Sequence, residues 1–272
     1  MTTLIHVNIQ KLLFEYTFLR KREIFGLKLG HTPDIATRAR AVPIYATTSF
    51  TFKNVEHAAN VFGGKESQLT FIRDNPTSSV FEQRMAALED GTNAISTPSG
   101  QVAQFVAIST ICSVGDSIIS TNCLYGMAEL TFSLRYSFVT LPRLGINVKF
   151  IRGDDPEEFA RLIDDKTKAI YLESMVNPKF DVPDFEAICK IAHVAGISII
   201  DNTFGVGGYL IKPIEHGADI VVHGRRNEMI GGHGTTIGGV VINGGTFKIM
   251  RIGPCQNPFV SFLLIQDLET LS

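Results

Sequence analysis

The 272-residue sequence lacks the features of a disulfide-stabilised, nucleic-acid-binding or membrane-spanning protein. Its four cysteines lie far apart without CxxC or metal-ligand spacing, so they predict free thiols in a reducing compartment. A formal net charge of -2 gives no sign of a nucleic-acid or anionic-membrane partner. No apolar run reaches the length that crosses a bilayer. Because 44% of the residues are hydrophobic, the chain can instead build one large domain or two ordinary ones.

The first 25 residues also lack the pattern of a targeting signal. Their basic cluster at 20–22 follows the apolar residues instead of preceding them, and Asn8, Gln10, Lys11 and Glu15 interrupt the apolar run. A short amphipathic segment or a disordered extension is therefore expected here, and the protein is expected to be cytoplasmic.

From about residue 26, short apolar runs alternate with helical periodicity. Buried strands are predicted at 93–97, 117–121, 148–151, 169–173 and 197–200, with helices at 81–89, 101–111, 156–163 and 184–195. This alternation predicts an α/β fold with a mostly parallel sheet covered on both faces. Ligands of such sheets bind beyond the carboxyl ends of the strands, so the candidate residues are those that follow each strand, at 99–101, 173–177, 201–203 and from 223 onward.

Two of these segments carry motifs that resemble a known family. Residues 201–210 read DNTFGVGGYL, and residues 223–239 read HGRRNEMIGGHGTTIGG. They resemble the pyridoxal-phosphate enzymes of cysteine and methionine metabolism, in particular the O-acetylhomoserine sulfhydrylases, which read HSATK-W-IGGHGTTIGG. The resemblance covers about residues 26–272. It implies the three-layer large domain of the aspartate-aminotransferase-like fold, pyridoxal phosphate as cofactor, and a small-molecule amino-acid substrate.

The resemblance also implies a cofactor site at the strand ends. Asp201 would keep the ring nitrogen of pyridoxal phosphate protonated, with Thr203 beside it; taken alone, Asp201 would be interpreted as a helix cap. Ser99, Gly100 and Gln101 open a predicted helix, where free N–H groups suit a phosphate. An N-cap serine would explain Ser99 equally well.

Three further residues belong to this implied site. Tyr125 would stack on the pyridine ring, although alone it is an ordinary half-buried aromatic residue. Asn177 would lie near the phenolic oxygen of the cofactor, although alone it would start the turn before Pro178. Relatives carry a YSR motif that reaches the neighbouring subunit's cofactor phosphate, and residues 71–73 here read FIR, which retains Arg73.

The lysine motif departs from the family. Asn227 falls on the lysine to which the cofactor is covalently attached, and a carboxamide cannot form that bond. Gly224 and Arg226 replace the serine and threonine whose hydroxyls bind the phosphate, and one extra residue near Glu228 precedes IGGHG. No intact catalytic residue is therefore expected, and covalent attachment of the cofactor is not expected.

The resemblance divides the chain into four parts. We expect a variable extension at 1–25, an N-terminal arm at 26–80, a pyridoxal-phosphate-binding-type α/β domain at 81–250, and at 251–272 a remnant of the helix that links to the C-terminal α+β domain of relatives. That domain carries the arginine for the substrate's α-carboxylate. The apolar segment 259–268 is expected to have no packing partner.

Three functions remain open. The parent reaction is the replacement of acetate by sulfide or a thiol at the γ carbon of O-acetylhomoserine. The first possibility is a sulfhydrylase-like protein that is inactive as this chain. The second is a non-catalytic partner of a full-length relative in a homo- or hetero-oligomer. The third is a sulfhydrylase-like enzyme of specialised metabolism that acts on O-acetylhomoserine.

Overall fold

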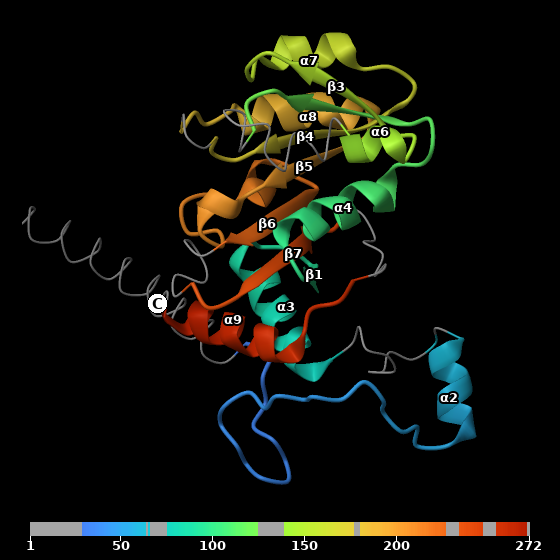
Figure 1. Cartoon of the computed structure of the whole chain (residues 1–272), viewed down its shortest axis with the longest axis vertical. Helices are drawn as coiled ribbons and strands as arrows, with labels where there is room; N and C mark the ends of the chain where they lie inside the picture. Colours follow the sequence, from blue (N-terminus) through green and yellow to red (C-terminus); the bar gives the residue numbers. More distant parts are fainter. Residues whose placement is uncertain are drawn as a thin grey trace, which may run out of the picture.

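The computed structural model describes residues 29–63, 65, 75–124, 139–176, 180–226, 234–246 and 254–270. These residues form a seven-stranded sheet with the strand order β1-β7-β6-β5-β4-β2-β3 (Figure 1). The strands are β1 Asn93–Thr97, β2 Ser117–Thr121, β3 Asn147–Ile151, β4 Thr167–Glu173, β5 Ile197–Asp201, β6 Ile220–Arg226 and β7 Ile237–Asn243. Strands β2 to β6 pair in parallel, and β7 runs antiparallel to both of its neighbours.

Helices cover both faces of this sheet. They are α3 Pro76–Leu88, α4 Gly100–Ile111, α6 Leu141–Arg143, α7 Pro156–Leu162, α8 Phe185–Ala195 and α9 Pro258–Thr270, with short 3-10 turns η4 Thr203–Gly205 and η5 Pro213–His216; a further helix, α2 Val55–Phe62, lies apart from the sheet (Figure 1). One buried cluster joins the strands to α3, α7, α8 and α9, and a second joins them to α4 and α6. The predicted mostly parallel, three-layer α/β fold is therefore confirmed.

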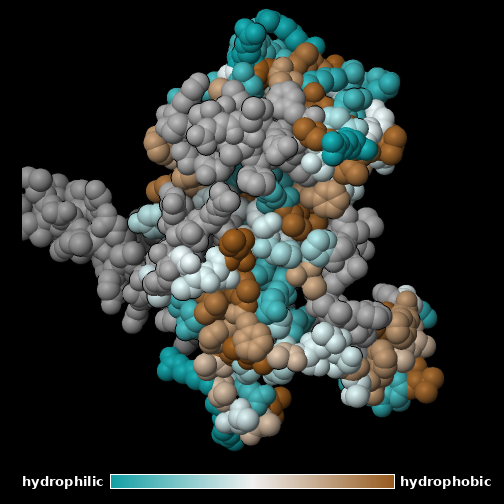
Figure 2. Space-filling view, in the orientation of Figure 1, coloured by the Kyte–Doolittle hydropathy of each residue, from teal (hydrophilic) through white to brown (hydrophobic). Residues whose placement is uncertain are grey.

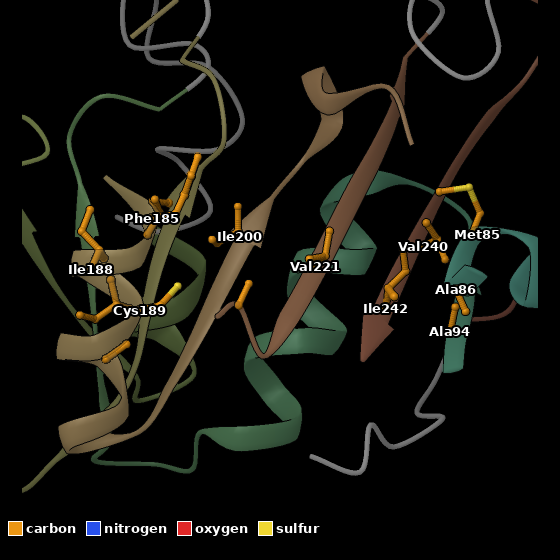
Figure 3. Packing of buried hydrophobic residues seen from close by; sticks show 14 of the residues in the cluster. Met85, Ala86, Ala94, Phe185, Ile188, Cys189, Ile200, Val221, Val240 and Ile242 are labelled. Carbon is orange, nitrogen blue, oxygen red and sulfur yellow. The ribbon is translucent and has the colours of Figure 1, made fainter. Parts of the chain in front are cut away.

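Side chains alternate between these two clusters along each central strand. In β5, Ile199 belongs to the α4 cluster, whereas Ile200 belongs to the α3 cluster. In Figure 3 the side chains of Ile200, Val221 and Ile242 lie on the face that also carries side chains from α3 and α8. Because successive side chains alternate between the two faces, neighbouring residues at a strand end point toward the α4 layer and the α3 layer in turn.

The helix α3 begins earlier than its sequence periodicity predicts. Periodicity alone places the helix at 81–89, but it starts at Pro76, whose fixed φ suits the first helical position. Asn75 caps it, because the Asn75 side chain accepts hydrogen bonds from the N–H groups of Thr77 and Ser78. The same start anchors the N-terminal arm, since the N–H of Tyr45 donates to Thr77 Oγ1 at 2.9 Å.

Strands β6 and β7 are absent from the sequence-based prediction. Their sequences, IVVHGRR and IGGVVIN, interrupt short apolar runs with glycine, histidine and arginine. They nevertheless lie inside the sheet, where β7 pairs with β1 on one side and with β6 on the other. Glycine is required at Gly239, because a Cβ there would lie 2.4 Å from the carbonyl oxygen of Ser99.

The C-terminal helix α9 packs on α3 and β7, which corrects the expectation that this segment has no partner. Leu264 and Ile265 are fully buried in the α3 cluster. The hydroxyls of Ser78 and Ser261 lie 2.8 Å apart, and Arg84 of α3 forms an ion pair with Glu269. The helix is therefore part of the core of the described fold.

Hydrophobic side chains nevertheless remain on the surface. Over α9, Phe259 is 55% exposed and Leu263 is 38% exposed. Over α2, which lies apart from the sheet, Val55 and Phe62 are exposed. Figure 2 shows apolar residues over both helices on the same face of the molecule. Within the described residues, no helix combines the length and apolarity that a membrane crossing requires.

Candidate functional site

The candidate site forms where α4 begins beside the carboxyl ends of β5 and β6. The ends of β4 and β5 lie side by side, with Glu173 and Asp201 as register partners. Helix α4 crosses β6 and β7 (Figure 1). Its first residue, Gly100, touches β6 so closely that an added Cβ would lie 2.2 Å from the Cα of Gly224. Only glycine permits this approach, which brings the start of α4 to the end of β6.

Asp201 is buried at this edge and receives four hydrogen bonds. Its Oδ2 accepts from Nε2 of Gln104 at 2.9 Å and from the hydroxyl of Tyr171 at 3.3 Å. Its Oδ1 accepts from the N–H of Thr203 at 3.0 Å and from the Thr203 hydroxyl at 2.5 Å. Because its neighbours on all these sides are donors, the carboxylate is held in one orientation on the α4 side of the sheet.

Thr203 links Asp201 to β6. Its hydroxyl donates to Asp201 and accepts from the N–H of Gly224 at 2.7 Å. Both hydrogen-bonding roles of the hydroxyl are therefore used within the protein, and the contacts of Thr203 orient Asp201 and Gly224 relative to each other. The turn that follows is tightly wound, because Val206, Gly207 and Gly208 all adopt left-handed backbone angles.

The first turn of α4 has the geometry of an anion site. Ser99 is extended and caps the helix, with its Oγ accepting from the N–H of Val102 at 3.3 Å. The N–H groups of Gly100 and Gln101 then have no acceptor within the helix. Partial positive charge at a helix N-terminus favours an anion at these groups.

The residues present fit a cofactor that has a phosphate at one end and a basic ring nitrogen at the other. Gln104 lies one helical turn beyond Gly100 and donates to Asp201, so a single helix connects the anion-binding turn with the buried carboxylate. A bare Cα at Gly100 and at Gly224 lets the free N–H groups of α4 begin directly beside the end of β6. Pyridoxal phosphate has this pair of groups.

The structure brings together Ser99, Gly100, Gln101, Asp201 and Thr203 at this edge. Four other residues of the implied site lie outside the described residues: Arg73, Tyr125, Asn177 and Asn227.

Two residues at this edge, Gln104 and Tyr171, were missed by sequence reasoning. A signal for Gln104 existed, since it stands one turn after Gly100 on the same predicted helix. Tyr171 lies within an apolar strand, where only tertiary packing reveals that its hydroxyl reaches Asp201.

Comparisons with known proteins agree with this geometry. The sequence profile of the family described as "Cys/Met metabolism PLP-dependent enzyme" matches residues 25–272. Homocysteine synthase of Schizosaccharomyces pombe is 45% identical over 292 residues, which cover 92% of this chain and 67% of that protein. O-acetyl-L-homoserine sulfhydrylase 1 of Thermus thermophilus is 46% identical over 228 residues, which cover 83% of this chain and 53% of that protein. The chain thus spans between about half and two thirds of the length of these curated relatives.

A solved structure that contains a pyridoxal-phosphate derivative shares the fold of this chain. The Campylobacter jejuni protein described as an O-acetylhomoserine (thiol)-lyase superposes with a TM-score of 0.83 and 29% sequence identity, over 92% of this chain and 70% of that one. That structure carries pyridoxyl-lysine phosphate. The described fold is therefore that of the large domain of these pyridoxal-phosphate enzymes.

Proposed function

Because this chain belongs to the Cys/Met metabolism family of pyridoxal-phosphate-dependent enzymes, we propose that it is a sulfhydrylase-like protein that binds the family's cofactor without a covalent bond and is inactive as this chain. The observation that carries the binding part of the proposal is the hydrogen bond from Gln104 to Asp201. This hydrogen bond holds the carboxylate of Asp201 in a fixed position relative to the anion-binding turn of α4.

Each described residue has a definite role in this proposal. When bound, pyridoxal phosphate supplies an electron sink for carbanion chemistry. Asp201 holds the proton on the ring nitrogen, and Gln104 and Thr203 keep that carboxylate in place. The free N–H groups of Gly100 and Gln101 bind the phosphate. Tyr125 and Asn177 complete the proposed site as the family resemblance implies, and Arg73 of a neighbouring subunit would reach its phosphate.

Inactivity follows from the residue at the lysine position. In relatives that lysine acts as nucleophile, base and acid in turn, and the amide of Asn227 can take none of these roles at neutral pH. The substitutions Gly224 and Arg226 also remove two hydroxyl groups from the phosphate site. We therefore expect a cofactor that binds reversibly and washes out.

The test of binding uses equilibrium dialysis with pyridoxal phosphate and a matched pair of variants. Asp201→Asn removes the charge that faces the ring nitrogen, and we expect affinity to fall about tenfold or more, as for the loss of one charged hydrogen bond. Asp219→Asn is the control. Asp219 is equally buried before β6, at the opposite edge of the sheet, and accepts from Ser198, His193 and Thr246. It should lower stability without changing affinity. Equal loss of affinity in both variants would contradict the assignment of Asp201.

The test of inactivity measures acetate release from O-acetylhomoserine with added sulfide and pyridoxal phosphate. The wild-type chain should give none, and mass spectrometry after borohydride reduction should detect no adduct on the peptide that contains Asn227. Asn227→Lys alone should not restore turnover, because the extra residue near Glu228 misplaces the amine and a misplacement of about 1 Å can cost about a hundredfold in rate. Turnover by the wild-type chain would instead support an enzyme of specialised metabolism.

The second candidate function is that of a non-catalytic partner. The exposed Phe259 and Leu263 on α9, and Val55 and Phe62 on α2, favour it, because apolar patches on one face mark association surfaces (Figure 2). The partner would be a second copy or a full-length relative. Size-exclusion chromatography of the wild-type chain and of Phe259→Glu tests this idea. A wild-type monomer that does not co-elute with a full-length sulfhydrylase would exclude it.

A further inference from the structure

A buried carboxylate connects three parts of the fold on the side of the sheet opposite Asp201. Glu89 follows α3, Asn202 follows β5, and His223 lies in β6; all three are 0% exposed. Oε1 of Glu89 accepts from Nδ2 of Asn202 at 2.8 Å and lies 2.6 Å from Nε2 of His223. The same Asn202 amide donates to the carbonyl of Ile211 at 2.9 Å, which adds the turn after β5 to the cluster.

The members of this cluster are the chain neighbours of the site residues. Asn202 directly follows Asp201, and His223 directly precedes Gly224. Successive residues of a strand point to opposite faces, so each pair sends one residue to the α4 side and one to the α3 side. The buried clusters agree, since Val222 lies in the α4 cluster and Val221 in the α3 cluster. Any shift of Asn202 or His223 therefore moves the backbone that carries Asp201 or Gly224.

Burial of this polar cluster has a free-energy cost that a purely stabilising role does not explain. Removing a carboxylate from water costs several kcal/mol unless a partner compensates, and an apolar replacement of similar volume often serves stability as well. Oε2 of Glu89 and Nδ1 of His223 have no hydrogen-bond partner among the described residues. Both hydrogen bonds of the Glu89 side chain are made by Oε1, one to Asn202 after β5 and one to His223 in β6. Together they join the ends of β5 and β6 on this side of the sheet.

We propose that Glu89 is a positioning residue of the cofactor site. Through Asn202 and His223 it fixes the spacing of the carboxyl ends of β5 and β6. Thr203 spans the same two strands on the other face, where its hydroxyl joins Asp201 to the N–H of Gly224. The contacts of Glu89 on one face and of Thr203 on the other therefore hold the ends of β5 and β6 together. We call these two sets of contacts the clamp. This inference rests on the proposed function for its ligand, but the clamp itself exists in the ligand-free chain.

The test measures hydrogen exchange of the Thr203 and Gly224 amides in the ligand-free chain, followed by pyridoxal-phosphate titration. Glu89→Gln keeps the shape of the side chain and removes its charge. Exchange at both amides should speed up at least tenfold, and cofactor affinity should fall by about the same factor. Ile188→Val and Ile188→Ala are the controls, because Ile188 of α8 is fully buried in the apolar cluster on the same side of the sheet. The control whose melting temperature matches Glu89→Gln should leave both amides protected.

Asn202→Ala provides a second variant if Glu89→Gln does not fold. It keeps Glu89 and His223 paired and removes the hydrogen bonds of Asn202 to Glu89 and to the carbonyl of Ile211, so exchange should rise more at Thr203 than at Gly224. Exchange in Glu89→Gln no faster than in the matched Ile188 control would overturn the positioning role. If the wild-type chain binds no pyridoxal phosphate while Glu89→Gln still speeds exchange at both amides, the proposed function is refuted and the clamp is supported.

Discussion

The contact between Gly100 and Gly224 makes an asymmetric prediction about two alanine substitutions. In Gly100→Ala the new Cβ lies 2.2 Å from the Cα of Gly224 and 3.1 Å from its nitrogen. Unstrained carbon atoms stay about 3.5–4.0 Å apart, so the start of α4 and the end of β6 must separate by more than about 1 Å. Both sides of the contact are backbone, and no side-chain rotation can relieve it.

The magnitude follows from three effects. Overpacking of this kind costs about 1–3 kcal/mol. A displacement of Gly224 away from α4 also strains the hydrogen bond from its N–H to Thr203, which is worth about 1 kcal/mol. Alanine recovers at most about 1 kcal/mol over glycine in a helix, and less at the first position. We therefore expect Gly100→Ala to lower the free energy of unfolding by about 2–3 kcal/mol and to abolish measurable cofactor binding.

Gly224→Ala tests the same contact from the other side. Its Cβ would lie 3.3 Å from Oγ1 of Thr203 and 3.4 Å from the Cα of Gly100, so shifts of a few tenths of an ångström suffice. Alanine also gains about 0.5–1 kcal/mol over glycine within a strand, and the net change should stay within about 1 kcal/mol of zero. Urea unfolding of both variants measures the difference. Equal costs, or a neutral Gly100→Ala, would refute the close approach of α4 to β6.

Three further predictions concern stability and reactivity. Arg84→Met should lower stability by about 2–4 kcal/mol in urea unfolding, because it removes the ion pair of the buried Arg84 with Glu269 and its hydrogen bond to the carbonyl of Leu29. Hydrogen bonds from Lys149 and Thr167 lower the pKa of Asp164 to about 2, so its contribution is present above its usual pKa near 3.8 and is lost as the pH falls toward 2; Asp164→Asn should flatten this part of a stability profile. Burial raises the pKa of the Cys112 thiol to about 12, so iodoacetamide at pH 8 should spare it until the chain unfolds.

Sequence patterns predicted the strands whose apolar runs are continuous. The bounds of β1 and β2 match the prediction, because turn residues delimit each run clearly. Strands β6 and β7 escaped prediction because function and close packing replace apolar residues there. Gly224 lies where Gly100 of α4 approaches its Cα, and Gly239 passes against the carbonyl of Ser99. Such residues look like turns until the neighbouring element is known.

The same limit applies to the site. Asp201 and the turn at Ser99 were predictable, since a carboxylate after a strand and a serine before a helix are local signals. The contacts of Asp201 with Gln104 and Tyr171 were not, because these residues lie 97 and 30 positions away from it in sequence, and the only local signal was the place of Gln104 one turn after Gly100. The partner of α9 was missed for the same reason, since the contact between Ser78 and Ser261 joins residues 183 positions apart.

The frame that would hold the cofactor is independent of the residue that would react with it. Asp201, Gln104 and Thr203 bond to one another and to β6, and each of these contacts is made without any residue beyond Gly224. A substitution at Asn227 therefore changes the chemistry available at the site without removing a member of this hydrogen-bonded frame. Cofactor binding and catalysis can then be lost separately, and a chain of this family can keep the first after the second is gone.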